Sequence, residues 1–303
     1  MKEIKPVKNL NAVVTMPGSK SYTNRALIIG ALANGKTVIN NALFSDDTKY
    51  MISALKDLGI AVFEDQNKKS ISVNGKNGEI PVKTANLFIG NAGTAMRFLT
   101  AMLTTGKGVY EIDGIESMRN RPIQDLIDAL NQMGADVKSK NNNGCPPVLI
   151  KSGSLKGGHC KIKGDLSSQY ISAMLMVAPY CDNDISIEII GDLVSKRYVD
   201  MTISLMDHFG VHVQNRSYRE FFIENKHKYI AKEYHVEGDA SGASYFLAAA
   251  AIAGGTVRVE GIGTDSAQGD VYFADLLEKM GCQIKKGRDY IEVKGGSLKG
   301  IDA

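Results

Sequence analysis

Hydrophobic and polar residues recur along this chain in four similar stretches, each of which opens with a short loop of small polar residues and continues as an apolar run. The length of the runs favours helices over strands. They cover residues 24–33, 95–103, 171–178 and 243–253. One polar residue per stretch marks the repeat, and the markers follow one another at intervals of 73, 74 and 73 residues: Ser21, Thr94, Ser168 and Ser241. Such regular spacing predicts four copies of one structural unit.

Each apolar run is followed by the same succession of patterns. A segment rich in β-branched residues comes first and indicates a strand, at 37–40, 108–112, 185–189 and 256–259. An amphipathic helix is predicted next, at 47–58, 123–133, 199–209 and 271–280. Each amphipathic helix ends at a glycine, the residue that best adopts the left-handed conformation of a helix C-terminus: Gly59, Gly134, Gly210 and Gly281. A last strand is predicted directly after each glycine, at 60–63, 135–137, 211–213 and 282–284.

The repeated unit is therefore β-α-β-α-β-like, and its period is too long for the common solenoids. Units of this size are typical of compact α/β domains. The apolar helices at 26–33 and 243–253 have no polar face, so we expect both to be buried on all sides, with helices inside and sheets outside.

Composition narrows the class of protein. The 303 residues carry 36 basic and 33 acidic side chains, interspersed along the chain, and this balance argues against a nucleic-acid partner. No apolar run reaches the roughly 18 residues of a membrane span, and the first residues lack the apolar core of a signal peptide. We therefore expect a cytoplasmic protein. The four cysteines and five histidines match no metal-binding spacing, so we expect free thiols, no metal and no cofactor.

The polar loops of the first three copies are the candidate chemistry. Each lies at a predicted helix N-terminus, where free N–H groups and a partial positive charge favour anions. The loops and their surroundings hold hydroxyl, amide and basic side chains: Lys20, Ser21, Arg25, Thr94, Arg97, Arg121, Ser167, Ser168, Gln169, Ser195 and Lys196. Brought together, they would form an anion-binding pocket.

Helix capping is the alternative interpretation of these loops, because serine and threonine cap helices whether or not a ligand binds. The basic residues Lys20 and Arg25 exceed what a cap requires. The fourth copy lacks them, so Asp239 is interpreted as a cap alone. The segment around Gly18 does not qualify as a nucleotide-binding P-loop, because the first glycine of that motif is missing.

Two long motifs resemble those of a known family. Pro17-Gly18-Ser19-Lys20-Ser21 with Asn24-Arg25-Ala26 resembles the opening signature of EPSP synthases, and residues 87–97 resemble their phosphoenolpyruvate loop. Shorter matches follow in the same order and spacing over the whole chain: Arg121-Pro122-Ile123, Ser167-Ser168-Gln169, residues 191–196 and residues 236–241.

The resemblance implies an enolpyruvyl-transferase-like α/β fold, an inside-out α/β barrel of two domains with three copies each. Residues 18–236 would form the complete domain that binds shikimate 3-phosphate. Residues 1–17 and 237–303 would form an incomplete second domain with one copy. The family's acidic and basic proton-transfer residues lie beyond position 303, so the chain would be C-terminally truncated, and we expect it to bind substrate without turning it over.

The implied activity is transfer of the enolpyruvyl group from phosphoenolpyruvate to the 5-hydroxyl of shikimate 3-phosphate, a step of the shikimate pathway to aromatic amino acids. The resemblance makes Lys20 the catalytic residue present, in contact with both substrates. Ser21 and Arg25 would hold the shikimate carboxylate. The remaining implied roles are the 3-phosphate for Ser167, Ser168 and Ser195, the shikimate ring for Gln169 and Tyr198, and phosphoenolpyruvate for Gly93 and Arg121. Asn91 and Thr94 are further implied substrate-binding residues. It implies a monomer without a cofactor.

Two other functions remain open. UDP-N-acetylglucosamine enolpyruvyl transferase shares the fold, but that enzyme typically has asparagine where Ser21 stands and a reactive cysteine in a loop that corresponds to 113–121, where this chain has none. A non-catalytic anion-binding fragment is the second alternative. The chain also departs from many EPSP synthases at Phe98, where proline is common, which bears on the shape of the phosphoenolpyruvate loop.

Overall fold

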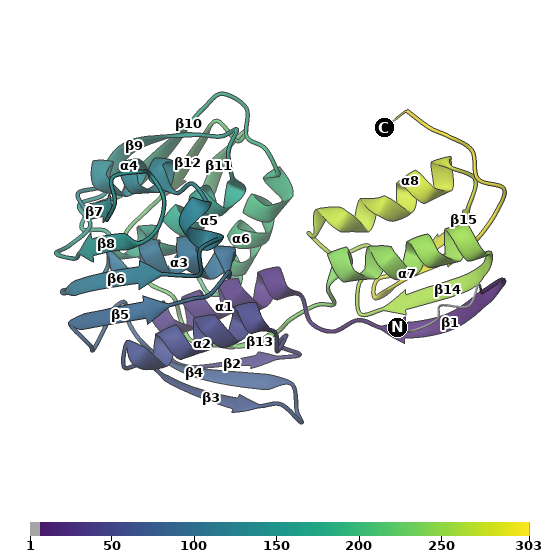
Figure 1. The fold of residues 1–303 in the computed structure, drawn as a ribbon, viewed down its shortest axis with the longest axis horizontal. Coiled ribbons are helices and arrows are strands. Elements are labelled where there is room, and N and C mark those ends of the chain that lie inside the picture. Colours follow the sequence, from purple (N-terminus) through teal and green to yellow (C-terminus); the bar gives the residue numbers. More distant parts are fainter. Residues whose placement is uncertain (1–6, 303) are drawn as a thin grey trace. The chain divides into compact units, whose positions relative to one another are not determined.

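The structure, a computed structural model, describes residues 7–302. The chain divides into two compact units, each of which is described by itself (Figure 1). Unit 1 comprises the residues up to Ser19 and those from Val236 onward, and unit 2 comprises Lys20–His235.

Four four-stranded sheets with one topology confirm the repeat. In each sheet the first two strands are parallel, and the third and fourth add on as antiparallel strands. Unit 2 holds three of them: β5(Thr84–Phe88)-β6(Val109–Asp113)-β8(Val148–Lys151)-β7(Asp136–Ser139), β9(Gly158–Lys163)-β10(Ile185–Ile190)-β12(Glu220–Ile223)-β11(Gln214–Arg216), and β13(Glu233–His235)-β2(Asn34–Asn40)-β4(Ser70–Lys76)-β3(Ala61–Asp65). Unit 1 holds the fourth: β1(Leu10–Thr15)-β14(Gly255–Glu260)-β16(Tyr290–Lys294)-β15(Gln283–Lys286).

The first strand of each sheet in unit 2 shows how its three copies are joined. In two sheets of unit 2 this strand directly precedes the apolar helix of its own copy. In the third it is β13, from the far end of the unit, which pairs with β2 through Glu233 opposite Val38. Because the last strand returns to the first copy, the three copies of unit 2 are tied into one body.

The apolar helices lie inside unit 2, as expected. They are α1(Lys20–Leu32), α3(Gly93–Leu103) and α5(Ser168–Val177). Helix α3 contacts both α1 and α5, and α1 is buried along its length from Tyr22 to Leu32. The amphipathic helices α2(Asp46–Asp57), α4(Gln124–Gln132) and α6(Lys196–His208) flank them, and the sheets lie outside (Figure 1). The four sheets of the described residues are open, so the strands close into no β-barrel.

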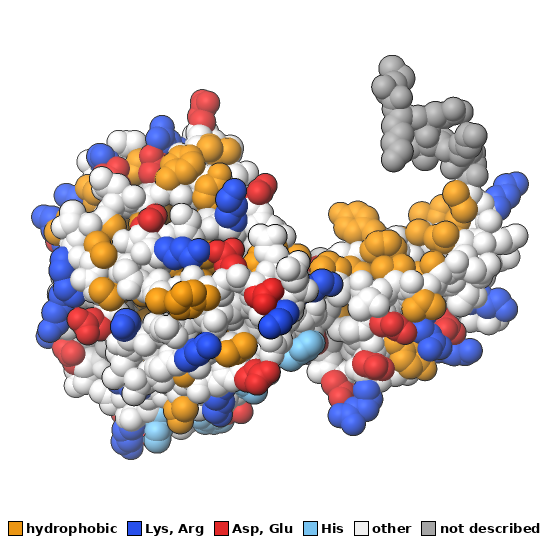
Figure 2. Space-filling view, turned by 90° about the horizontal axis from the view of Figure 1, so that it is seen from below, with side chains coloured by type: hydrophobic (Ala, Val, Ile, Leu, Met, Phe, Trp, Pro, Cys, Tyr) orange, Lys and Arg blue, Asp and Glu red, His pale blue; other side chains and the backbone are white. Residues whose placement is uncertain are grey.

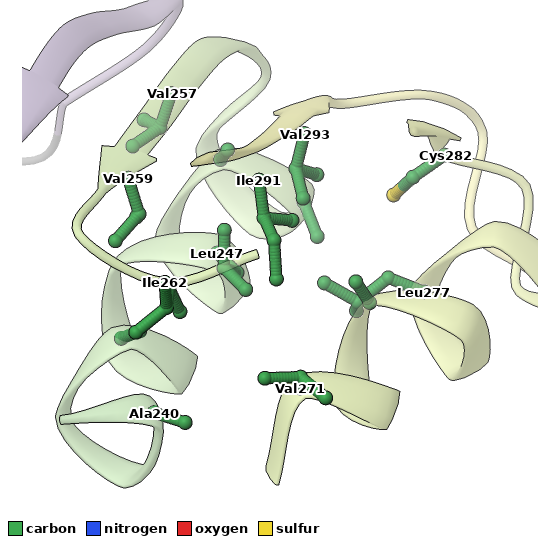
Figure 3. Packing of buried hydrophobic residues seen from close by; sticks show 14 of the residues in the cluster. Ala240, Leu247, Val257, Val259, Ile262, Val271, Leu277, Cys282, Ile291 and Val293 are labelled. Atoms are coloured by element: carbon green, nitrogen blue, oxygen red, sulfur yellow. The ribbon is translucent and has the colours of Figure 1, made fainter. Parts of the chain in front are cut away.

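Unit 1 has its own core between the sheet and two helices, α7(Ala240–Ala253) and α8(Phe273–Lys279). Figure 3 shows Leu247 of α7 and Leu277 of α8 pointing toward Ile291 and Val293 of β16. All four are nearly inaccessible to solvent, and burying an aliphatic side chain of this size contributes about 1.5–3 kcal/mol.

The expectation that helix 243–253 is buried on all sides is wrong. Helix α7 packs on the sheet and on α8, and its other face leaves Tyr245 78% and Ile252 79% exposed. Hydrophobic side chains gather on the visible part of unit 1 in Figure 2. Helix α1 is surrounded by three α-helices, α2, α3 and α6. In the described part of unit 1, α7 contacts one α-helix, the short 3₁₀ helix Gly269–Tyr272 and one sheet.

The expected strand at 211–213 is also wrong. Val211 and Val213 are buried in an irregular segment, and strand β11 begins after them, at Gln214. The sequence analysis took the strand after each glycine as the last strand of its unit. The structure adds one more strand to each sheet, which pairs with that strand as a hairpin: β4, β8, β12 and β16. The four glycines after the amphipathic helices have positive φ as expected, between 81° at Gly59 and 109° at Gly281.

Surface and thiol properties agree with the composition. On the face shown in Figure 2, basic and acidic side chains are interspersed. None of the helices in the described part of the chain combines the length and apolarity that crossing a membrane requires. The four cysteines are free, and burial raises the pKa of Cys160 and of Cys181 to about 12, so both thiols stay protonated at neutral pH.

Candidate substrate site

A pocket of about 270 Å³ opens in unit 2 where the helix N-termini meet. The first turns of α1, α3 and α5 and the loop before α6 line it, so the three polar loops of the sequence come together. Its lining residues are Ser21, Arg25, Thr94, Leu166, Ser167, Ser168, Gln169, Val194, Ser195 and Tyr198. Helices α1, α3, α5 and α6 span ten residues or more, and their N-termini favour an anion here.

Helix capping does not occupy all the serine hydroxyls of the pocket. Ser167 caps α5 by accepting the Gln169 N–H at 3.3 Å. Ser195 precedes α6 but makes no capping hydrogen bond, and its backbone is left-handed, with φ 53°. Such a conformation costs a non-glycine residue of the order of 1 kcal/mol. Within the described part of the chain, the Ser168 and Ser195 hydroxyls donate to no other group, which leaves them to a ligand.

Arg25 lines the pocket and is almost fully buried, at 2% exposure. Its Nε donates to Thr202 Oγ1 at 2.7 Å, and Nη1 donates to the Ser21 carbonyl at 3.0 Å. Nη2 donates to the Tyr198 carbonyl at 3.1 Å and to Ser172 Oγ at 3.3 Å. The guanidinium is therefore held by neutral acceptors from three helices.

Arg25 keeps its positive charge without an acidic partner. Burial lowers the pKa of Arg25 to about 10, so the group stays protonated at neutral pH. The Phe98 and Tyr198 rings pack near it, 5.2 Å and 6.0 Å from Cζ to the ring centroids. Among the described residues, no carboxylate forms an ion pair with Arg25. Buried charges are normally paired, so this cation and the open hydroxyls together point to an anionic ligand.

A second basic group lies at the N-terminus of α3. The Arg121 guanidinium packs on Gly93 so closely that a Cβ at Gly93 would lie 2.5 Å from Nη1. Arg97 stabilises this arrangement by donating to the Gly93 carbonyl at 3.1 Å and to the Pro122 carbonyl at 3.0 Å. Arg97 therefore braces the loop beside the pocket instead of lining it. Burial is also the main cause that lowers the pKa of Arg97.

Comparison with known proteins decides the family. The sequence profile of EPSP synthase (3-phosphoshikimate 1-carboxyvinyltransferase) matches residues 4–303. The chain belongs to the EPSP synthase family. A 3-phosphoshikimate 1-carboxyvinyltransferase of Sulfurovum sp. (strain NBC37-1) is 50% identical over 301 residues, covering 99% of this chain and 70% of the relative. One of Shewanella pealeana is 48% identical, covering 99% and 71%.

The fold agrees with that assignment. An EPSP synthase structure from Acinetobacter baumannii matches with a TM-score of 0.82 at 26% identity, covering 97% of this chain and 68% of that one. The resemblance read from the sequence motifs is thereby confirmed, and so is the α/β fold class built from repeated units.

Four residues expected from EPSP synthases are outside the pocket lining: Lys20, Asn91, Gly93 and Arg121. Lys20 forms an ion pair with Asp47 of α2, 3.1 Å from Nζ to Oδ2. Asn91 accepts a hydrogen bond from Ser117 Oγ at 3.2 Å. Arg121 contacts Gly93 as described. The roles that the resemblance gives these four residues, and those it gives the residues of the lining, stay predictions.

Thr202 and Ser172 were missed by sequence reasoning. Each lies one helical turn after a residue of the pocket, because Thr202 follows Tyr198 by four positions and Ser172 follows Ser168 by four. Residues four apart share a helix face. That spacing is the signal that could have found both.

Proposed function

We propose that this protein transfers the enolpyruvyl group of phosphoenolpyruvate to the 5-hydroxyl of shikimate 3-phosphate, giving EPSP and phosphate in the shikimate pathway. The family assignment and the names of the relatives support this activity. The observation that carries the proposal is the charge of the pocket: a buried arginine without an acidic partner lies beside open serine hydroxyls at helix N-termini. An acceptor with one carboxylate and one phosphate complements both the buried guanidinium and the serine hydroxyls.

The carboxylate of the acceptor is assigned to Arg25 and Ser21. A guanidinium forms strong, directional hydrogen bonds with carboxylates, and Arg25 is already fixed in place. The 3-phosphate is assigned to Ser167, Ser168 and Ser195, where the N-termini of α5 and α6 supply positive potential. Gln169 and Tyr198 also line the pocket and would contact the ring.

Phosphoenolpyruvate is assigned to the loop at the N-terminus of α3, with Arg121, Gly93, Thr94 and Asn91 as its contacts. During transfer the acceptor hydroxyl loses a proton as its oxygen adds to the enol carbon of phosphoenolpyruvate and the methylene carbon gains a proton. The resulting methyl group then loses a proton when phosphate leaves. The pocket lining of unit 2 includes no carboxyl or imidazole group, so proton transfer requires a group from outside this lining. Lys20 is the proposed catalytic residue within the chain.

Removing single serine hydroxyls tests the phosphate site. We expect Ser168→Ala and Ser195→Ala each to weaken binding of shikimate 3-phosphate about 10-fold, because hydrogen bonds to charged groups contribute about 1.5–3 kcal/mol. Titration calorimetry measures the dissociation constants. Ser53→Ala is the matched control, since Ser53 is exposed on α2 and should leave binding unchanged.

The same titrations decide the proposal as a whole. If the unmodified protein fails to bind shikimate 3-phosphate, or if both serine variants bind it as well as the unmodified protein does, the assigned site is wrong. Phosphate release from phosphoenolpyruvate, measured alongside, tests the expectation that these 303 residues bind without turnover.

Binding should also depend on pH through Arg25. Its pKa in the free protein is about 10, lowered by burial, and a bound carboxylate favours the charged guanidinium. Above this pKa the guanidinium of the free protein is deprotonated, so binding of the carboxylate is accompanied by uptake of a proton by Arg25. We expect the affinity for shikimate 3-phosphate to be level from pH 7 to 9 as far as Arg25 contributes, and to fall above about pH 10. Calorimetry across this range measures it, and Arg25→Gln should remove the Arg25-dependent part of the fall.

The domain assignment stays a proposal as well. We assign the shikimate 3-phosphate side to residues 18–236, and an incomplete second domain to residues 1–17 and 237–303. The uncovered apolar face of α7, with Tyr245 and Ile252 exposed, supports the second assignment. Small-molecule substrates, a monomer and a cytoplasmic location complete the proposal.

A further inference from the structure

The hydrogen-bond acceptors around the Arg25 guanidinium are all neutral groups. Four of the five guanidinium N–H groups are directed at acceptors: the Thr202 and Ser172 hydroxyls and the Ser21 and Tyr198 carbonyls. Among the described residues, one N–H of Nη1 is left for a ligand. A carboxylate in place of either hydroxyl would pair with Arg25 and compete with an incoming anion.

The two hydroxyls form a connected pair. Thr202 Oγ1 accepts from Arg25 Nε at 2.7 Å and lies 2.9 Å from Ser172 Oγ and 2.9 Å from the Tyr198 carbonyl, to either of which its single proton can be donated. All three groups are buried, with Thr202 and Ser172 at 0% exposure. A buried hydrogen-bond network of this kind fixes the orientation of its members.

The pair also links Arg25 to the phosphate side of the pocket. Thr202 belongs to α6, which begins directly after Ser195, and Ser172 belongs to α5, which begins at Ser168. Arg25 itself comes from α1. The hydroxyl pair therefore connects the guanidinium to the two helices whose N-termini carry Ser168 and Ser195.

We propose that Thr202 and Ser172 are positioning residues that hold Arg25 at a set distance from Ser168 and Ser195, so that the pocket selects an acceptor carrying a carboxylate and a phosphate at matching separation. This inference rests on the proposed function. A ligand with both anionic groups depends on the separation, whereas inorganic phosphate alone does not. Misplacing a binding group by about 1 Å is enough to lose much of its contribution.

Substitution of Thr202 tests the inference. Thr202→Val removes the hydroxyl at nearly unchanged shape, and Thr202→Ser retains it as the conservative variant. We expect Thr202→Val to weaken binding of shikimate 3-phosphate about 10-fold, the loss expected for one hydrogen bond to a charged group, and to leave the affinity for inorganic phosphate within about twofold. Thr202→Ser should restore binding to within about threefold of the unmodified protein, because it keeps the hydroxyl. Equal weakening for both ligands would indicate a merely structural role, and unchanged binding of shikimate 3-phosphate would also overturn the inference.

A second measurement needs no substrate and separates this inference from the proposed function. The Arg25 Nε–H resonance, observed by ¹⁵N NMR, should exchange slowly with water in the unmodified protein, because this group is buried and bonded to Thr202. In folded Thr202→Val we expect exchange at least about 10-fold faster, since the partner is gone. An unchanged exchange rate contradicts the positioning role. If the unmodified protein binds no shikimate 3-phosphate but exchange responds as expected, the proposed function fails while the Thr202 contact stands.

Discussion

Arg25→Gln is expected to weaken binding of shikimate 3-phosphate by about 100-fold or more. Arg25 is the only basic residue in the lining of the described pocket, and its charge has no acidic partner within the described residues. Glutamine can reach some of the same acceptors but carries no charge. Loss of a buried, charge-assisted contact costs about 3 kcal/mol or more, and each 1.4 kcal/mol changes a dissociation constant tenfold.

Titration calorimetry on the folded variant measures this loss, with circular dichroism as the check on folding. Arg216→Gln is the control, because it removes the same charge from an exposed position on β11, where Arg216 pairs with Glu220. We expect the control to bind like the unmodified protein. Comparable weakening in both variants would mean that net charge, and not the buried guanidinium, governs binding.

Gly93→Ala is expected to weaken phosphoenolpyruvate binding at least about 10-fold, the effect of losing roughly 1.4 kcal/mol, with little change in stability. The added Cβ would lie 2.5–2.8 Å from three guanidinium atoms of Arg121, so that side chain must move. The far end of an arginine moves at small cost, and alanine is favourable in a helix. The damage should therefore fall on the assigned phosphoenolpyruvate contact and not on the fold.

The measurement is a titration of phosphoenolpyruvate into protein saturated with shikimate 3-phosphate, together with thermal denaturation. Affinity for shikimate 3-phosphate itself should stay within about twofold, since Gly93 is outside the lining of its pocket. Gly153→Ala is the control, because no atom lies within 4 Å of a Cβ at that position. Undiminished phosphoenolpyruvate binding in Gly93→Ala would remove Arg121 from the proposed site.

The sequence alone determined the repeat and the local structure around it. Regular spacing of Ser21, Thr94 and Ser168 identified equivalent helix N-termini, and the structure places all three in one pocket. Gly59 and Gly134 were identified as helix ends because each follows an amphipathic pattern and a positive φ strongly favours glycine. Such features depend on neighbours along the chain, which the sequence contains.

The tertiary structure decided the features that depend on which helices and sheets pack together, namely burial and the partners of charged groups. The apolar runs 26–33 and 243–253 both lack a polar face, yet the first, in α1, is enclosed by helices and the second, in α7, leaves Tyr245 exposed. Arg97 and Arg25 are both helix arginines in family motifs, but Arg97 hydrogen-bonds a loop beside the pocket while Arg25 lines the pocket. Burial and the partners of a charged group are set by which elements pack together. Hydrophobic periodicity predicts which face of a helix or strand is buried, but it does not predict which other element covers that face.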